Sequence, residues 1–147
     1  MNNKERSVAL FKEGFCCSQA VFATYAEQWG LDRELFLKIT DAFGGGIGGM
    51  AGICGAVIAP IMAIGLKYGR TRPDDDEAKQ KTHTLVKEFV KQFKDRNGSI
   101  ECKQLLGVDI SIPEGLSLAK EKGVFDSKCP KLIEDAVEIL DGILSKQ

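Results

Sequence analysis

The 147-residue sequence lacks several features that would point directly to a function. It has no C-x-x-C or C-x-x-C-H run, so haem attachment through that motif is excluded. Its 20 lysines and arginines are balanced by 21 aspartates and glutamates, so no basic excess attracts a nucleic-acid backbone or an anionic membrane. The single histidine, His83, lies between two threonines in a charged segment, which favours a surface position over a ligand or a base.

Five cysteines remain as the main source of chemistry. The first residues, MNNKERSVALFKEGF, carry charges too early and too often for a secretory signal, so we expect a cytoplasmic protein. Structural disulfides are rare in a reducing cytosol, and an odd number of cysteines argues against a fully paired framework. The cysteines therefore need a role other than cross-linking the fold.

Alternating apolar runs typical of strands are missing, and helical periodicity recurs instead. We predict an all-α fold: one domain over residues 1–147, a bundle of six or seven helices, with a glycine-rich loop before a buried central helix. The segment 107–128 is expected to be mostly loop, and Pro130 is expected to open the last helix. The predicted helices cover residues 3–13, 18–29, 33–43, 53–66, 74–95, 99–106 and 130–144.

The stretch FGGGIGGMAGICGAVIAPIMAIGLKYG carries no charge until Lys67 and has three interpretations. A membrane span needs about 20 helix-forming residues, but only residues 53–66 form a convincing apolar helix, and Pro60 interrupts it. A membrane partner is therefore not expected.

A second interpretation is a cofactor-binding loop, because Gly44, Gly46 and Gly49 fit the pattern G-x-G-x-x-G. That fingerprint needs a preceding strand and an acidic residue about 20 positions later. The segment LFLKITDAF could pass as a strand, but the next acidic residue after Asp41 is Asp74, which is too far along the chain. The alternative is that these glycines permit a tight turn and a close approach of the backbone.

The third interpretation concerns Cys54, which lies near the start of the buried helix. Unpaired N–H groups and the helix dipole favour a thiolate there, although the dipole alone supplies only about 0.3–1 kcal/mol. Burial by Ile53, Val57 and Pro60 would act in the opposite direction and raise the pKa of the thiol. We expect Cys54 to be the most reactive thiol and the attacking sulfur in any exchange.

Three more cysteines, Cys17, Cys102 and Cys129, also lie near predicted helix starts. A single cysteine is often just a small buried hydrophobe, but the repeated placement predicts a functional set. We expect the sulfurs of these three residues and of Cys54 to converge on one region. Cys16 is expected to point elsewhere, because neighbours in sequence face different sides of a helix.

The arrangement resembles the C_GCAxxG_C_C family of redox-active proteins. CCSQAV resembles the first cysteine segment of that family, FGGGIGGMAGICGAVIA its glycine-rich lead and box, and ECKQLLG and KCPKLI its third and fourth cysteine sites. The resemblance implies that Cys17, Cys54, Cys102 and Cys129 are the signature residues and that Cys16 is an extra one. The chain departs from the box where Ala59 replaces the final glycine, and the resemblance implies a redox chemistry without naming a substrate.

Three functions stay open from the sequence. The first is thiol–disulfide exchange or electron transfer with an unidentified redox partner. The second is a zinc or iron–sulfur site held by Cys17, Cys54, Cys102 and Cys129, although the usual short ligand spacings are missing. The third is a non-enzymatic helical binding module, whose apolar surface around Ile58, Ile61 and Met62 could also join two copies in a homodimer.

Overall fold

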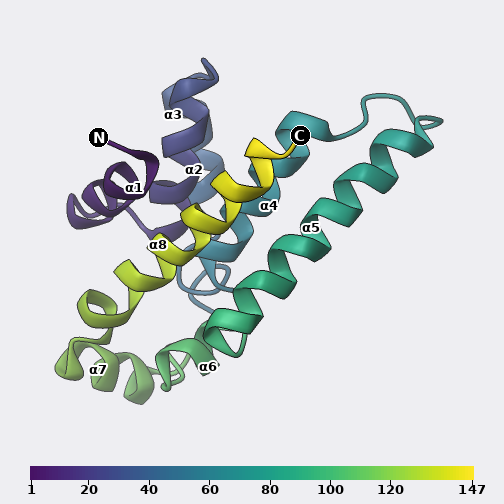
Figure 1. The fold of residues 1–147 in the computed structure, drawn as a ribbon. Helices are drawn as coiled ribbons and strands as arrows, with labels where there is room; N and C mark the ends of the chain where they lie inside the picture. Colours follow the sequence, from purple (N-terminus) through teal and green to yellow (C-terminus); the bar gives the residue numbers. More distant parts are fainter.

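The computed structural model describes residues 1–147 and contains eight α-helices. The all-α prediction is confirmed, and the predicted number of six or seven helices is too low by at least one. In chain order the helices are α1 (Asn3–Lys12), α2 (Cys17–Gln28), α3 (Arg33–Asp41), α4 (Gly55–Tyr68), α5 (Asp76–Asn97), α6 (Cys102–Leu106), α7 (Pro113–Lys122) and α8 (Val124–Ser145) (Figure 1).

The extra helix, α7, lies in the segment that we predicted to be mostly loop, and that prediction is wrong. Pro113 occupies its first helical position, where the missing N–H has no intrahelical partner in any case. Gly123 ends the helix with a left-handed backbone, φ 66°, which is the usual conformation of a C-terminal capping glycine. The sequence therefore carried both end signals of α7, but only Ala119 of that helix is buried, so its apolar periodicity is weak.

The last helix begins at Val124, six residues before the predicted start at Pro130. A proline inside a helix loses one backbone hydrogen bond and crowds the preceding turn, at a cost of about 3 kcal/mol. Helix α8 offsets this cost because it buries apolar side chains along its whole length, among them Ile133, Val137 and Leu140.

The other helix ends follow the sequence signals. The carboxylate of Asp32 accepts a hydrogen bond from the backbone N–H of Leu35 and caps α3, and aspartate is among the preferred residues for this position. Gly98 ends α5 with φ 81°. These local signals are strong because each satisfies backbone groups that the helix itself leaves unpaired.

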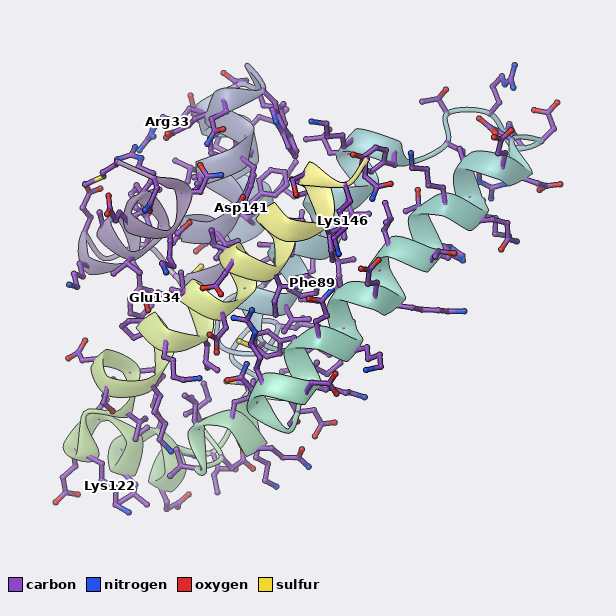
Figure 2. All side chains as sticks on the ribbon, viewed as in Figure 1. Arg33, Phe89, Lys122, Glu134, Asp141 and Lys146 are labelled. Carbon is purple, nitrogen blue, oxygen red and sulfur yellow. The ribbon has the colours of Figure 1, made fainter.

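Helices α2 and α4 form the centre of the molecule, and α1, α3, α5 and α8 pack around them. Figure 1 shows the two long helices, α5 and α8, running side by side along one flank. Phe89 of α5 is fully buried between them, whereas the charged side chains of α5 point outward (Figure 2). The large core that results joins 24 buried residues.

A second, smaller core lies at the end of the molecule where α6, α7 and the first turns of α8 meet. Its six buried residues are Ala51, Cys102, Leu106, Ile110, Ala119 and Val124, and Cys129 packs against them. Cys54 belongs to the large core and Cys17 packs against it. The signature cysteines are thus divided equally between the two cores.

An apolar groove of about 420 Å³ runs between α3 and α4. Leu35, Ile39 and Leu66 line it and are each about half exposed. Of the three residues expected to form an apolar surface, Met62 lines this groove, but Ile61 and Met62 also pack against the large core. None of the helices has the length and apolar character needed to cross a membrane.

Candidate functional site

All five cysteines line one cavity of about 170 Å³, at the place where the two cores meet. The rest of its wall is apolar or glycine: Phe11, Gly45, Gly46, Gly55, Leu105, Leu106, Phe125 and Leu132. The expected convergence of Cys17, Cys54, Cys102 and Cys129 is therefore observed. The expectation that Cys16 points elsewhere is wrong, because Cys16 lines the same cavity.

Cys54 and Cys102 are held side by side by backbone pairing. Ile53 and Glu101 form an isolated antiparallel bridge just before α4 and α6. The N–H of Cys54 donates to the carbonyl of Ile100 at 2.8 Å, and the N–H of Cys102 donates to the carbonyl of Gly52 at 2.6 Å. Cys54 is then the N-cap of α4 and Cys102 the first residue of α6, so both lie at helix starts as predicted.

Cys17 opens α2, also as predicted, and this start of α2 packs directly against the start of α4, next to Cys54. This contact depends on Gly55, the first residue of α4. A Cβ atom at position 55 would lie 2.6 Å from the Sγ of Cys17 and 3.0 Å from the backbone nitrogen of Ser18. The starts of α2 and α4 can approach this closely because position 55 has no side chain.

Cys129 does not lie at a helix start. It is the sixth residue of α8, and Pro130 follows it inside the helix. The prediction was based on Pro130 as an opening signal, and the turn from Val124 to Lys128 forms despite the proline. Cys129 still reaches the cavity, because the buried face of α8 passes the end of the smaller core.

A family model described as "Putative redox-active protein (C_GCAxxG_C_C)" matches residues 15–143, which include all five cysteines. The chain belongs to the C_GCAxxG_C_C family. The description of the family supports a general redox role for the protein. A comparison with curated proteins and with solved structures gives no match. Where the C_GCAxxG_C_C box departs from its pattern, Ala59 is fully buried in α4, so a small residue still serves the helix packing.

Three of the four signature thiols of this C_GCAxxG_C_C protein are stabilised in the protonated form. Burial raises the pKa of Cys102 to about 11 and that of Cys129 to about 12. The pKa of Cys17 lies well above its usual value, chiefly because of the neighbouring thiol of Cys54 and also because desolvation disfavours the charged form. At neutral pH these three cysteines are therefore thiols and not thiolates.

The glycine-rich loop forms one wall of the cavity and lacks the context of a dinucleotide fingerprint. Helix α3 precedes the loop, where that fingerprint requires a strand. Gly46 has φ 73°, and a Cβ atom there would lie 2.5 Å from the backbone nitrogen of Gly52. Gly44 contacts Cys16, and Gly49 has a positive φ with open space around it. These positions explain the glycines by turn geometry and close packing.

Sequence reasoning missed two residues of the site, Cys16 and Gly55. The cysteine pair at the start of CCSQAV was the available signal for Cys16, which is the N-cap residue of α2 and not an interior helical residue. Nothing in the sequence alone could reveal the contact of Gly55, since it depends on how α2 meets α4. No group of three or more His, Cys, Asp or Glu side chains is arranged to hold one metal ion.

Proposed function

We propose that this protein is a thiol–disulfide oxidoreductase in which Cys17 and Cys54 cycle between a dithiol and a disulfide. The observation that supports this pair is the close approach of two helix starts: a Cβ atom at position 55, next to Cys54, would lie 2.6 Å from the Sγ of Cys17, and both cysteines line one cavity. The short distance between helix starts supplies the closeness that a C-x-x-C motif supplies in other proteins.

The exchange would proceed in two balanced steps. The thiolate of Cys54 attacks one sulfur of a substrate disulfide, R–S–S–R′, forms a mixed disulfide with R–S, and releases R′–S⁻. The thiolate of Cys17 then attacks the Sγ of Cys54, forms the Cys17–Cys54 disulfide and releases R–S⁻. The substrate disulfide thus gains two electrons from the dithiol. The two protons of the dithiol are released to water or to the leaving thiolates.

Cys54 is assigned the attacking role because of its position as the N-cap of α4. The backbone N–H groups of Gly55 and Ala56 have no carbonyl partner, and although the Sγ of Cys54 makes no cap hydrogen bond with them, unpaired N–H groups at a helix start favour a negative charge nearby. Cys17 suits the second role, because it opens the neighbouring helix and lines the same cavity as Cys54.

Zinc or an iron–sulfur cluster held by the four signature cysteines is a second use of the same sulfurs. Four thiolates suit these groups chemically. The four sulfurs share a cavity, but they are not arranged as the ligands of one metal ion.

The pH dependence of alkylation of the reduced, metal-free protein tests the role of Cys54. We expect a fast phase below pH 7 that is missing in Cys54→Ser and retained in the matched control Cys102→Ser. Labelling of Cys54 no faster than that of a free cysteine would contradict the proposed role. Metal analysis of protein purified without oxygen separates the two uses of the sulfurs: iron or zinc near one per chain would favour the metal site.

A further inference from the structure

The attacking member of the proposed dithiol, Cys54, is almost completely shielded from solvent, whereas Cys17 is partly exposed. Cys54 is only 5% exposed, and the cavity that it lines holds about 170 Å³. A disulfide with two bulky substituents does not fit into that volume beside the five sulfurs. Reduction of such a bulky disulfide therefore requires a thiol that can be reached from the wider groove outside, whereas Cys54 can attack only a disulfide that enters the cavity.

Cys16 is the one cysteine that lines both the cavity and a second, wider groove beside it. This groove of about 670 Å³ is more open to solvent and shares Phe11, Cys16 and Phe125 with the cavity. We refer to it as the entry groove. Cys16 is not one of the four signature cysteines implied by the family resemblance. It also has no part in the proposed Cys17–Cys54 dithiol, so its place at this boundary needs a separate explanation.

The surroundings of Cys16 suit a thiol that takes part in exchange. Burial raises its pKa, and the backbone N–H of Gln19, which hydrogen-bonds to the sulfur, offsets part of this effect. The hydroxyl of Ser18 lies 3.2 Å from the Sγ of Cys16 and donates its own hydrogen to the carbonyl of Thr40. Gly44 lies directly against it: a Cβ atom at that position would be 3.0 Å from the Sγ of Cys16. The glycine-rich loop thus confines the sulfur to the boundary between the entry groove and the cavity.

The entry groove has a mixed apolar and charged lining. Three phenylalanines, at positions 11, 15 and 125, offer flat apolar surface, and Lys12 and Lys120 offer two positive charges against the single negative charge of Asp126. A ligand that matches this lining carries an aromatic or apolar group and an anionic group. An open groove of this size accommodates a small molecule.

We propose that Cys16 is the entry thiol for small anionic disulfides bound in the entry groove, an inference that rests on the proposed Cys17–Cys54 dithiol. The Cys16 thiolate attacks the substrate R–S–S–R, forms Cys16–S–S–R and releases R–S⁻. Cys54 then attacks the Sγ of Cys16, releases the second R–S⁻ and forms a Cys16–Cys54 disulfide. Cys17 finally attacks the Sγ of Cys54, which regenerates the Cys16 thiolate and leaves the Cys17–Cys54 disulfide. The two electrons come from Cys17 and Cys54.

Stopped-flow reaction of the reduced protein with 5,5′-dithiobis(2-nitrobenzoate), an anionic aromatic disulfide, tests the entry role. We expect Cys16→Ser to slow the first release of thionitrobenzoate at least about tenfold, because Cys16 is the one cysteine that lines the entry groove. In Cys54→Ser the adduct should remain on Cys16, as located by fragmentation of the tryptic peptide of residues 13–33. An unchanged first phase in folded Cys16→Ser, or an adduct on another cysteine, would overturn the proposal.

The lysines provide a test that does not alter any thiol. The double variant Lys12→Gln/Lys120→Gln should slow the reaction with the anionic disulfide about three- to tenfold at low salt. Its reaction with the neutral 4,4′-dithiodipyridine should change less than about twofold. The control is Lys122→Gln, because Lys122 lies at the outer end of α7 and does not line the entry groove (Figure 2). Equal slowing with both reagents, or none, would contradict the anionic preference.

The equilibrium between dithiol and Cys17–Cys54 disulfide separates this inference from the function on which it rests. Equilibration with dithiothreitol measures it independently of the entry route, so Cys16→Ser should reach the same equilibrium more slowly. If wild-type protein forms no Cys17–Cys54 disulfide, the proposed function fails. If the disulfide forms and Cys16→Ser reaches it as fast as wild type, only the entry role fails.

Discussion

Replacement of Gly55 by alanine should separate the starts of α2 and α4 and so weaken the proposed dithiol. The added Cβ atom would lie 2.6 Å from the Sγ of Cys17, where ordinary contacts begin at 3.4 Å, so the helices must move apart by roughly 1 Å. Overpacking of this kind costs about 1–3 kcal/mol, and the better helix propensity of alanine returns at most about 1 kcal/mol. We therefore expect a net loss of about 1–2 kcal/mol and a fall in Tm of about 3–6 °C.

The redox consequence is measured by equilibration with dithiothreitol. Because the displacement separates Cys17 from Cys54, the equilibrium constant for their disulfide should fall about tenfold, which corresponds to about 30 mV. The matched control is Gly65→Ala in the same helix, where an added Cβ atom meets nothing within 4 Å. This control should be as stable as wild type or up to about 1 kcal/mol more stable, with an unchanged equilibrium. If Gly55→Ala behaves like Gly65→Ala, the close contact of Cys17 with α4 does not exist as described.

Three further predictions concern the loop, the buried thiols and a buried tyrosine. Gly46→Ala should destabilise by about 2–4 kcal/mol in urea unfolding, because alanine would have to adopt φ 73° with its Cβ atom 2.5 Å from a backbone nitrogen; a loss below 1 kcal/mol would contradict this loop geometry. The raised pKa values of Cys102 and Cys129 contribute stability that is complete below the pKa of an unfolded cysteine, about 8.5, and is lost as the pH rises toward 11–12. Wild type should therefore lose more stability between pH 8 and pH 10 than the double variant Cys102→Ser/Cys129→Ser. Parallel stability profiles of the two proteins would refute this prediction. Tyr25→Phe removes a hydroxyl that donates to the carboxylate of Asp141 at 2.8 Å and should cost about 1.5 kcal/mol by chemical denaturation, whereas an unchanged midpoint would show that this hydrogen bond has no net value.

The helical class and most helix ends could be predicted because they depend on local chemistry. The side-chain cap at Asp32 and the left-handed Gly98 act within one turn of the chain. Pro130 misled the prediction, because proline is common at helix starts and its cost inside α8 is offset by burial against other helices. That burial is a tertiary effect, and a local signal cannot reveal it.

The candidate site could be predicted in its membership but not in its arrangement. The helix-start placement and the family resemblance pointed to the four signature cysteines that line the cavity. The proximity of Cys17 and Cys54 could not be predicted, because it arises where the starts of α2 and α4 meet at Gly55. The same holds for Cys16, whose position depends on the packing of the glycine-rich loop against it.

The most direct test of the central claim is to identify the first disulfide that forms when the reduced, metal-free protein is mildly oxidised in its folded state. The four signature cysteines fall in four different tryptic peptides, residues 13–33, 39–67, 97–103 and 129–131, so each possible link gives a distinct mass. Cys16 shares the first peptide with Cys17, and the Cys16→Ser variant removes this ambiguity. The proposed function predicts a single link between residues 13–33 and 39–67 that persists in Cys16→Ser and disappears in Cys54→Ser. Links confined to Cys102 and Cys129, or no link while all thiols remain free, would contradict it.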